Sequence, residues 1–197
     1  MKFTLSQYNE LKAAVIKAGY QSEIDWANNI QHPKDSVAFF CEYCWVVVNS
    51  GMKNQIAQKI HEKIINAIAD GKCARDVFGH KGKTTAIDQA WESKFELFDK
   101  LLGCNSPEET LAYCESLPFI GKITKYHLAK NCGAQVAKPD RWLIRVANES
   151  GEGVQELCER ISSESGDKVS VVDNVIWRAC NLGLWGDQKN EQTKLKI

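Results

Sequence analysis

The residue types in this chain that could do chemistry are concentrated between residues 117 and 146. Residues 117–121, Leu-Pro-Phe-Ile-Gly, lie between two stretches of helical periodicity, 106–116 and 123–131, and so predict a helix-hairpin-helix. A tight turn followed by a helix N-terminus leaves backbone N–H groups without partners, and together with the helix dipole these groups form a phosphate site. We expect Gly121 to need an unusual backbone angle or to allow a bound ligand to approach closely.

One carboxylate follows the hairpin after about twenty residues. Asp140 lies in the sequence Pro-Asp-Arg-Trp-Leu-Ile-Arg-Val, residues 139–146, and stands at the start of another predicted helix. Asp at this position is a good N-cap, because its side-chain oxygen accepts hydrogen bonds from the first N–H groups of the helix. A carboxylate near a phosphate site can also stabilise the positive charge that develops on a sugar ring when a glycosidic bond breaks. Capping and catalysis are compatible roles for Asp140.

The hairpin, the carboxylate and the trailing Arg145-Val146 together resemble the helix-hairpin-helix (HhH-GPD) DNA glycosylase superfamily, which includes endonuclease III and the adenine-mismatch, 8-oxoguanine and alkyl-purine glycosylases. In that family a Leu-Pro-Gly-x-Gly hairpin leads into a helix, and an Asp lies roughly seventeen to twenty residues beyond the position at which lyase members carry Lys. Here that position is Ile123, and Asp140 follows seventeen residues later. Phe119 replaces the family's Gly, so we expect a hairpin conformation that a bulky residue tolerates.

The resemblance implies an all-α protein of two helical domains with a cleft between them. We expect a six-helix domain over residues 31–136, ending in the helix-hairpin-helix with its hairpin at 117–122. A second helical domain is expected from both chain ends, residues 1–30 and 137–197. In this arrangement the catalytic residue would be Asp140, assisting hydrolysis of the N-glycosidic bond of a modified or mismatched base.

Ile123 decides whether the resemblance implies base excision alone or base excision with AP-lyase activity. Lyase members use an amine that forms a Schiff base with the sugar, and an isoleucine cannot do this. Lys122 and Lys125 flank it, but helical side chains one and two positions away point roughly 100° and 200° from it. We therefore predict a monofunctional DNA glycosylase that leaves an abasic site, with AP-lyase activity weak or absent. Whether Lys122 or Lys125 gives residual lyase activity stays open.

Further DNA contacts are expected from two segments. The DNA-backbone contacts expected from the hairpin and the following turn are Ile120, Gly121, Lys122, Thr124 and Lys125. The loop over residues 49–55 resembles the helix-joining loop that fills the gap left by a flipped base in 8-oxoguanine glycosylases. The residues expected to act as this wedge, or to line the base pocket, are Met52, Lys53, Asn54, Gln55 and Trp142.

The net charge of the chain is zero, but the charge is unevenly distributed. Residues 119–146 hold six basic side chains and one carboxylate, Asp140. Such a basic cluster on a neutral protein favours phosphate binding over a merely solvated helix face. We expect double-stranded DNA containing a modified base as the partner, and a protein that is a monomer.

Helical periodicity covers almost the whole chain, and no strand pattern of any length occurs. The expected helices are 6–19, 23–30, 33–49, 53–69, 85–102, 106–116, 123–131, 141–149, 154–163 and 168–181. A polar loop is expected over 71–83. Ser106 and Glu109 have the spacing of a capping box.

The eight cysteines do not have the spacing of a metal site. Cys41 and Cys44 form the only Cys-x-x-Cys pair, in an apolar helical pattern, which favours buried free thiols. Some endonuclease-III-like proteins hold an iron–sulfur cluster through four C-terminal cysteines, whereas only Cys158 and Cys180 follow the Asp motif here. We expect neither an iron–sulfur cluster, nor a metal, nor any other cofactor.

The remaining features exclude several classes of protein. The hydrophobic content of 44% is that of a soluble globular protein. The N-terminus lacks an apolar signal core, and the most apolar run is too short to cross a bilayer, so we expect a cytoplasmic protein. Disorder is expected only over 188–197.

Two other functions fit the same motifs. In the first, the chain is a non-catalytic helix-hairpin-helix module that binds DNA, and Asp140 is only a cap. In the second, it is a repurposed member of the superfamily that processes hypermodified thymine in DNA, as the missing lysine and the unusual Phe119 would allow. The base that is recognised cannot be derived from the sequence.

Overall fold

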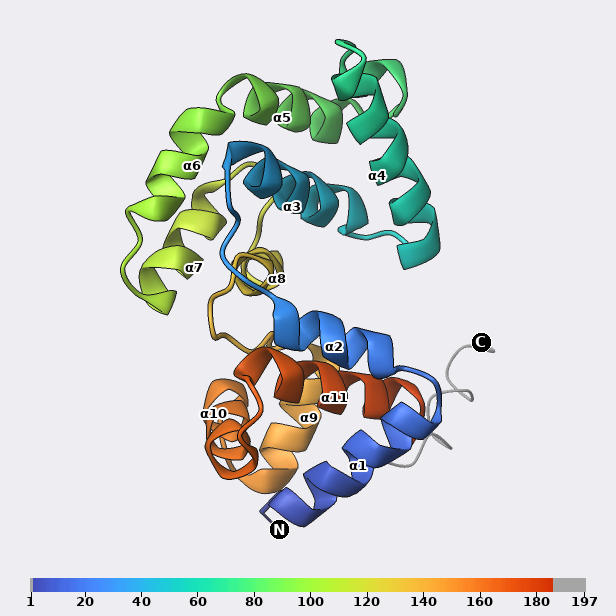
Figure 1. Cartoon of the computed structure of the whole chain (residues 1–197), viewed down its shortest axis with the longest axis vertical. Helices are drawn as coiled ribbons and strands as arrows, with labels where there is room; N and C mark the ends of the chain where they lie inside the picture. Colours follow the sequence, from blue (N-terminus) through green and yellow to red (C-terminus); the bar gives the residue numbers. More distant parts are fainter. Residues whose placement is uncertain (1, 186–197) are drawn as a thin grey trace, which may run out of the picture. The chain divides into compact units, whose positions relative to one another are not determined.

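The computed structural model describes residues 2–185, and within this range the chain is built of α-helices with one 3-10 turn and no strand (Figure 1). This confirms the predicted all-α class. None of the described helices is both long and apolar enough to cross a membrane. Residues 188–197, for which disorder is predicted, lie outside the described range. The elements are α1 (Leu5–Lys17), α2 (Gln21–Asn29), α3 (Ser36–Asn49), α4 (Asn54–Ala69), η1 (Ala74–Asp76), α5 (Lys81–Glu92), α6 (Lys94–Leu102), α7 (Pro107–Ser116), α8 (Thr124–Asn131), α9 (Arg141–Ser150), α10 (Val154–Ser165) and α11 (Val169–Asn181).

The chain divides into two compact units. Unit 1 combines residues 1–30 with 135–197, and unit 2 consists of residues 31–134. The division falls two residues before the boundary drawn from the sequence. Its position has a local cause, because the side chain of Gln155 on α10 accepts a hydrogen bond from the Ala137 N–H (2.7 Å) and donates one to the Gln135 carbonyl (2.9 Å). These bonds attach residues 135–137 to unit 1.

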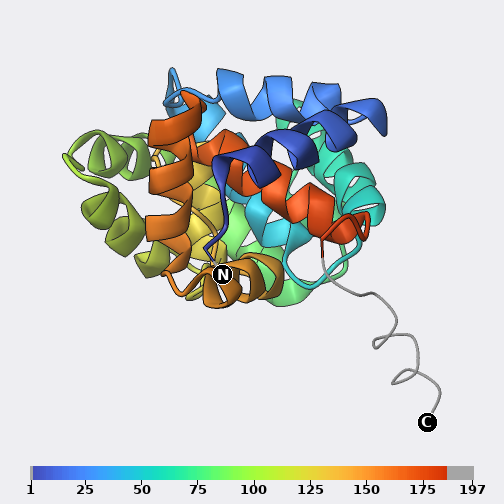
Figure 2. The same ribbon diagram turned by 90° about the horizontal axis from the view of Figure 1, so that it is seen from below.

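Helix α11 forms the centre of unit 1 and packs against α1, α2, α9 and α10 (Figures 1 and 2). Its apolar side chains, among them Val172, Val175 and Ile176, are completely buried. Burial on nearly all sides explains why this helix is rich in β-branched residues despite their modest helix propensity, since tertiary packing outweighs propensity in a core. Helices from both ends of the chain are thus held on one central helix.

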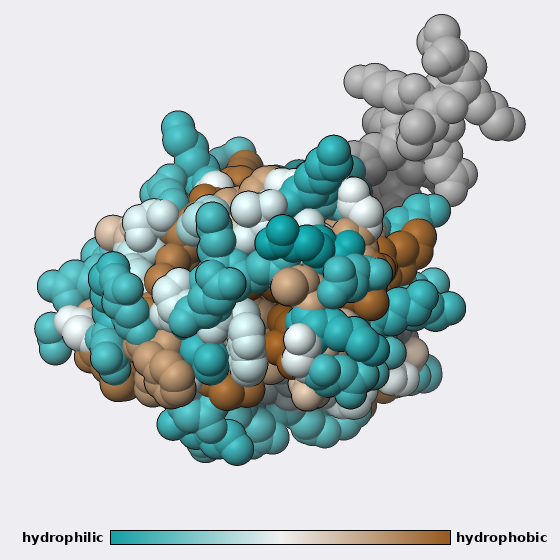
Figure 3. All heavy atoms as spheres, turned by 90° about the horizontal axis from the view of Figure 1, so that it is seen from above, coloured by the Kyte–Doolittle hydropathy of each residue, from teal (hydrophilic) through white to brown (hydrophobic). Residues whose placement is uncertain are grey.

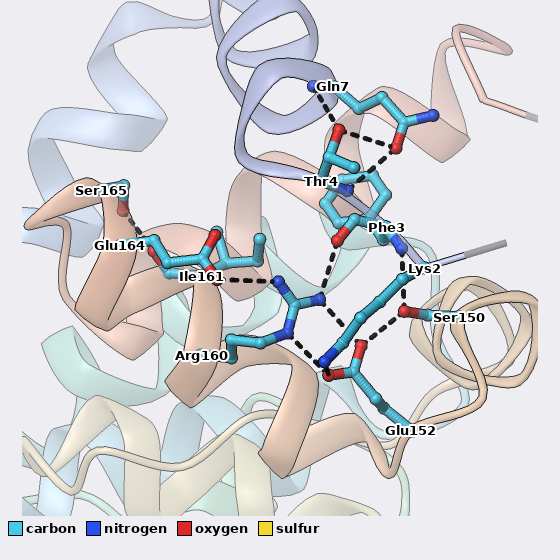
Figure 4. Close-up of polar contacts among 10 residues, drawn as sticks. All are labelled: Lys2, Phe3, Thr4, Gln7, Ser150, Glu152, Arg160, Ile161, Glu164 and Ser165. Atoms are coloured by element: carbon cyan, nitrogen blue, oxygen red, sulfur yellow. Dashed lines mark hydrogen bonds and ion pairs between the residues drawn. The ribbon is translucent and has the colours of Figure 1, made fainter.

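A partly buried ion pair fastens the N-terminal segment of unit 1 to the loop between α9 and α10 (Figure 4). The Arg160 guanidinium donates to both carboxylate oxygens of Glu152, at 2.6 and 2.8 Å, and to the Phe3 carbonyl at 2.7 Å. The Phe3 N–H in turn donates to the Ser150 hydroxyl at 2.9 Å. The guanidinium lowers the pKa of Glu152 to about 2, because it favours the ionised carboxylate.

Helix α3 is the core of unit 2 and packs against α4, α5, α6 and α8. It begins at Ser36 rather than at the predicted residue 33, because the Asp35 side chain caps it by accepting from the Ala38 N–H at 2.8 Å. The predicted helix over 85–102 is wrong in two respects: α5 already begins at Lys81, and the helix breaks at Ser93. The Ser93 hydroxyl donates to the Gln89 carbonyl at 2.6 Å, a back-bond that bends helices.

We expect Glu152→Gln to lower the free energy of unfolding by about 2 kcal/mol at pH 7, because it removes one partner of a partly buried, doubly hydrogen-bonded ion pair. A carboxyl whose pKa falls on folding stabilises the protein above its ordinary pKa of 4.5, and this contribution is lost as the pH falls towards 2. The difference between wild type and variant should therefore shrink over that range. Urea denaturation at a series of pH values measures it.

Glu164→Gln is the matched control, because Glu164 also pairs with Arg160 but at 3.1 Å, one helical turn away, and with a side chain that is 40% exposed. Exposed pairs of this kind contribute roughly 0.5 kcal/mol or less. Equal effects of the two substitutions, or a Glu152→Gln effect that stayed constant down to pH 2, would contradict this assignment.

Candidate nucleic-acid interface and active-site carboxylate

The hairpin of unit 2 connects α7 to α8 and is anchored by two buried apolar side chains, Leu117 and Ile120. The turn is closed by a hydrogen bond from the Ile120 N–H to the Leu117 carbonyl at 3.1 Å. The hydroxyl of the buried Tyr43 on α3 donates to the Pro118 carbonyl at 2.9 Å. This contact, between residues 75 positions apart, ties the hairpin to the central helix and was not evident from the sequence.

Phe119 has a backbone φ of 61°, in the left-handed region that favours glycine. The predicted conformation, one that a bulky residue tolerates, is therefore wrong, because Phe119 adopts a backbone conformation that disfavours any Cβ. Its ring is accommodated by Gly82 on α5, where a Cβ would lie 2.7 Å from the ring's Cζ. Gly121, by contrast, has no positive φ and has space for a Cβ. The unusual backbone angle predicted for Gly121 is therefore not found in the protein without a ligand.

The backbone N–H groups of the hairpin fall into two sets. Those of Ile120 and Gly121 are used internally, the second by the Thr124 hydroxyl at 2.7 Å. Within the described part of the chain no acceptor is assigned to the N–H groups of Lys122, Ile123 and Thr124, and α8 has no side-chain cap. Three successive donors at the start of a helix are a suitable site for an anion. The N–H groups of Ile120 and Gly121, which are among the predicted phosphate contacts, thus already donate hydrogen bonds within the protein. The N–H groups without an assigned acceptor belong to the next three residues of the chain.

The predicted basic side chains have different surroundings. Lys122 is exposed, but the Lys125 ammonium donates to the Glu115 carboxylate of α7 at 2.5 Å. Lys130 is buried, and Arg145 pairs with Glu149 at 3.1 Å. The basic cluster counted along the sequence is therefore partly neutralised by acids that lie outside residues 119–146.

The side chain of Ile123, at the lyase position, is 46% exposed just before α8. Lys122 lies before α8, so its side-chain direction relative to Ile123 does not follow from helical geometry. The helical argument that the side chain points away from position 123 therefore applies to Lys125 alone. Lys125 is directed to Glu115 of the neighbouring helix, which also raises the pKa of the lysine through their hydrogen bond. A protonated, ion-paired ammonium is a poor nucleophile.

The loop over 49–55 joins α3 to α4. Met52 is half-buried, Lys53 is the residue before α4, and Asn54 and Gln55 are exposed in its first turn. The base of the loop is held by the buried Lys83 of α5, whose ammonium donates to the carbonyls of Val48 at 3.1 Å and Ser50 at 2.7 Å. The polar loop predicted over 71–83 is wrong at residue 83, because α5 already begins at Lys81.

Asp140 of unit 1 is the N-cap of α9. Its Oδ1 accepts hydrogen bonds from the N–H groups of Trp142 at 2.9 Å and Leu143 at 3.1 Å. Among the described residues no hydrogen-bond partner is assigned to its Oδ2, and this atom is not among the buried unsatisfied ones. One oxygen therefore fixes the orientation of the carboxylate and the other remains accessible.

Burial raises the pKa of Asp140, and the nearby Asp173 carboxylate adds to the shift, while the two capping N–H groups oppose it. Asp173 is buried on α11 and accepts from the Lys138 N–H at 3.0 Å. Together with the bonds of Gln155 to residues 135 and 137, this contact fixes the segment that carries Asp140. Nothing in the sequence indicates this role of Gln155, because only tertiary contacts define it.

Trp142 is half-buried and packs against the core of unit 1, with the Arg141 guanidinium 4.6 Å from its ring centre. Its predicted pocket role stays a prediction. Cys44 is buried on α3, and burial raises the pKa of its thiol, while Cys41 is only partly buried. Among residues 2–185 no group of three or more His, Cys, Asp or Glu side chains could hold a metal ion.

No protein-family model matches this chain, and no curated protein sequence is significantly similar to it. Its fold, however, matches solved structures. It is similar to 8-oxoguanine DNA glycosylase of Methanocaldococcus jannaschii, with a TM-score of 0.65, 17% identity, and coverage of 91% of this chain and 94% of that one.

The same archaeal 8-oxoguanine glycosylase/lyase, in complex with a 15mer DNA containing 8-oxoguanine, matches with a TM-score of 0.64 and 16% identity over 88% of this chain and 96% of that one. The 8-oxoguanine DNA glycosylase of Thermotoga maritima matches with a TM-score of 0.62 and 14% identity over 88% and 93%. The fold that the resemblance implies is thereby confirmed, because the chain has the fold of these 8-oxoguanine DNA glycosylases.

We expect Phe119→Gly to be more stable than Phe119→Ala by about 1 kcal/mol, because both lose the ring but only alanine keeps a Cβ at positive φ. Phe95 provides the control, since it is 67% exposed on α6, where alanine should be the more stable by roughly 0.5–1 kcal/mol. Chemical denaturation of the four variants tests whether the order of stability of glycine and alanine is opposite at the two positions. The same order at both positions would argue against a strained residue 119.

We expect Asp140→Asn to be at least as stable as the wild type at pH 7, and Asp140→Ala to be less stable by about 1 kcal/mol, because only Asn retains a capping oxygen. A carboxyl with a raised pKa destabilises the fold increasingly as the pH rises from its ordinary 3.8 through the raised value. The advantage of Asn should therefore vanish near pH 3. A large loss of stability in Asp140→Asn would show that the ionised carboxylate supports the fold.

Proposed function

We propose that this chain, which has the fold of 8-oxoguanine DNA glycosylases, is itself a DNA N-glycosylase that excises a modified or mismatched base. The single observation that supports this most is the geometry of Asp140. One of its oxygens is fixed by the start of α9, and the other has no hydrogen-bond partner assigned among the described residues. It also lies seventeen residues after position 123, as in the family that the motif resembles. A purely structural cap would not require this spacing.

In the proposed reaction, the bond between C1′ of deoxyribose and the base nitrogen breaks, and both bonding electrons leave with the base. The sugar develops positive charge, which the Asp140 carboxylate stabilises. A water molecule then adds its oxygen to C1′, and its proton passes to the carboxylate or the departing base. A carboxylate whose pKa burial has raised is a stronger base for this step. The products are a free base and an abasic site.

We propose that the enzyme is monofunctional. Ile123 cannot form a Schiff base, and Lys125 is held by Glu115 on the adjacent helix. Lys122 remains as an exposed amine, but its position just before α8, beside the open N–H groups, suits it to phosphate contact. Water is then the nucleophile, and the strand stays intact after the base has left.

The other predicted contacts indicate how the protein would bind DNA and extrude the base. The open N–H groups of Lys122, Ile123 and Thr124 would bind a backbone phosphate of duplex DNA. The base must leave the stack to reach a carboxylate, and the exposed residues of the loop from Met52 to Gln55 would fill the gap. Trp142 would lie beside the extruded base. The protein would act as a monomer, and the reaction needs no cofactor, because a carboxylate and water suffice.

The substrate class is a modified base in double-stranded DNA. The similar structures are those of 8-oxoguanine glycosylases, so 8-oxoguanine is the first base to test. Duplexes that carry uracil, hypoxanthine, alkylated purines and oxidised or hydroxymethylated pyrimidines complete the panel. The last of these also tests the alternative in which the protein processes hypermodified thymine.

The experiment is a single-turnover incubation of excess protein with each duplex, followed by treatment with or without alkali. We expect strand breakage only after alkali, and a loss of at least about a hundredfold in rate in Asp140→Asn. Borohydride should trap no covalent complex with the wild type. Because Asn preserves the cap, this variant separates catalysis from folding.

Each other outcome has a definite meaning. Breakage without alkali, together with borohydride trapping, would show a lyase, and Lys122→Ala and Lys125→Ala would then identify the amine. Binding of every duplex without excision of any base would favour the non-catalytic module. Full activity in Asp140→Asn would remove Asp140 from the reaction.

A further inference from the structure

We propose that three ring-bearing residues beside the hairpin, Phe78, His80 and Phe119, form a second DNA contact site that binds the sugar–phosphate backbone next to the phosphate held by the hairpin. We call these residues the ring platform. The proposal rests on the proposed function, because it requires that the hairpin binds DNA. It adds a site that the helix-hairpin-helix motif does not contain.

The platform lies within unit 2 and joins segments about forty residues apart in sequence. The ring centroids of His80 and Phe119 are 6.1 Å apart with the planes at 88°, an edge-to-face arrangement. Those of Phe78 and His80 are also 6.1 Å apart, with the planes tilted by 35°. Phe119 is 47% exposed, and His80 is also exposed. Rings that stabilise one another but remain open to solvent form a surface rather than a core.

The protein maintains this arrangement at an energetic cost. Phe119 is the one non-glycine residue with positive φ in the described chain, and such a conformation costs on the order of 1 kcal/mol or more. At Gly82, within α5, any side chain would strike the Phe119 ring. Folding alone does not require a half-exposed phenylalanine at a position that glycine fills without strain. The ring therefore has a use at the surface.

The position of the platform indicates its ligand. Phe119 precedes Lys122 by three residues, so its backbone lies within about 11 Å of the first of the open N–H groups, that of Lys122. Phosphates follow one another every 3.4 Å or so of helix axis along one DNA strand. A strand held at the hairpin therefore passes within reach of the rings. Lys81, exposed beside His80, adds a positive charge. Rings with an adjacent cation suit a deoxyribose and its phosphate.

Exposed hydrophobic residues also occur elsewhere in unit 2, such as Phe95 and Leu102 on α6. The face seen in Figure 3 likewise shows hydrophobic areas between hydrophilic ones. Single exposed residues of this kind are ordinary on protein surfaces. Phe119 differs from them because its backbone is strained, its ring packs against Gly82, and it lies in the hairpin. Phe95 is therefore a suitable control.

The experiment measures the affinity of the full chain for a short undamaged duplex as a function of salt concentration. We expect Phe119→Gly to bind about tenfold more weakly at every salt concentration, with the slope of log K against log salt unchanged, because an apolar contact releases no counterions. His80→Ser, which keeps an N-cap side chain, should weaken binding in the same way. Phe95→Ala should bind like the wild type. Lys122→Ala should instead reduce the slope by about 1.

The possible failures are distinguishable. If the wild type binds DNA, and Phe119→Gly and His80→Ser bind equally well, the ring platform is overturned and the proposed function stands. If the wild type binds no duplex, both fail together. Thermal unfolding of each variant must show a folded protein. A change in sedimentation of the free protein on Phe119→Gly, with DNA binding unaltered, would make the platform an interface between copies of this chain and overturn the proposal.

Discussion

The candidate sites depend on one constraint, which is that the first N–H groups of every helix need acceptors. At α9 the Asp140 side chain supplies one, with bonds of 2.9 and 3.1 Å, and the carboxylate is thereby held in one orientation. At α8 no side chain caps the helix, and the donors of Lys122, Ile123 and Thr124 stay open. The same rule yields an oriented carboxylate in unit 1 and an anion site in unit 2.

The stabilising contacts around these sites come from distant parts of the chain. Tyr43 holds the hairpin through the Pro118 carbonyl, and Lys83 holds the loop after α3 through two carbonyls. Asp173 and Gln155 hold the segment before Asp140. In each case a side chain on a packed helix fixes a backbone segment that carries a candidate functional residue. Support of this kind positions a functional group through side chains that are themselves fixed by packing.

Several of these features oppose stability locally. The ammonium of Lys83 is buried, and its pKa is lowered by desolvation. Burial raises the pKa of Asp140, and Phe119 holds a backbone conformation that glycine would adopt freely. Strain and desolvation of this kind persist only where the surrounding structure imposes them, and they are frequent at binding and catalytic sites. Phe119 belongs to the hairpin and Asp140 to the proposed active site, while Lys83 on α5 holds the loop after α3.

The sequence by itself determined the all-α class, the hairpin between 117 and 122, and the helix that starts after Asp140, because these depend on local periodicity, breakers and caps. It did not reveal the backbone angle of Phe119, since nothing local indicates that Gly82 of another helix accommodates the ring. Nor could it show that Lys125 is paired with Glu115. The tertiary structure decided these points, because a side chain's partner across two helices depends on how the helices pack, and periodicity specifies only which face of a helix is buried.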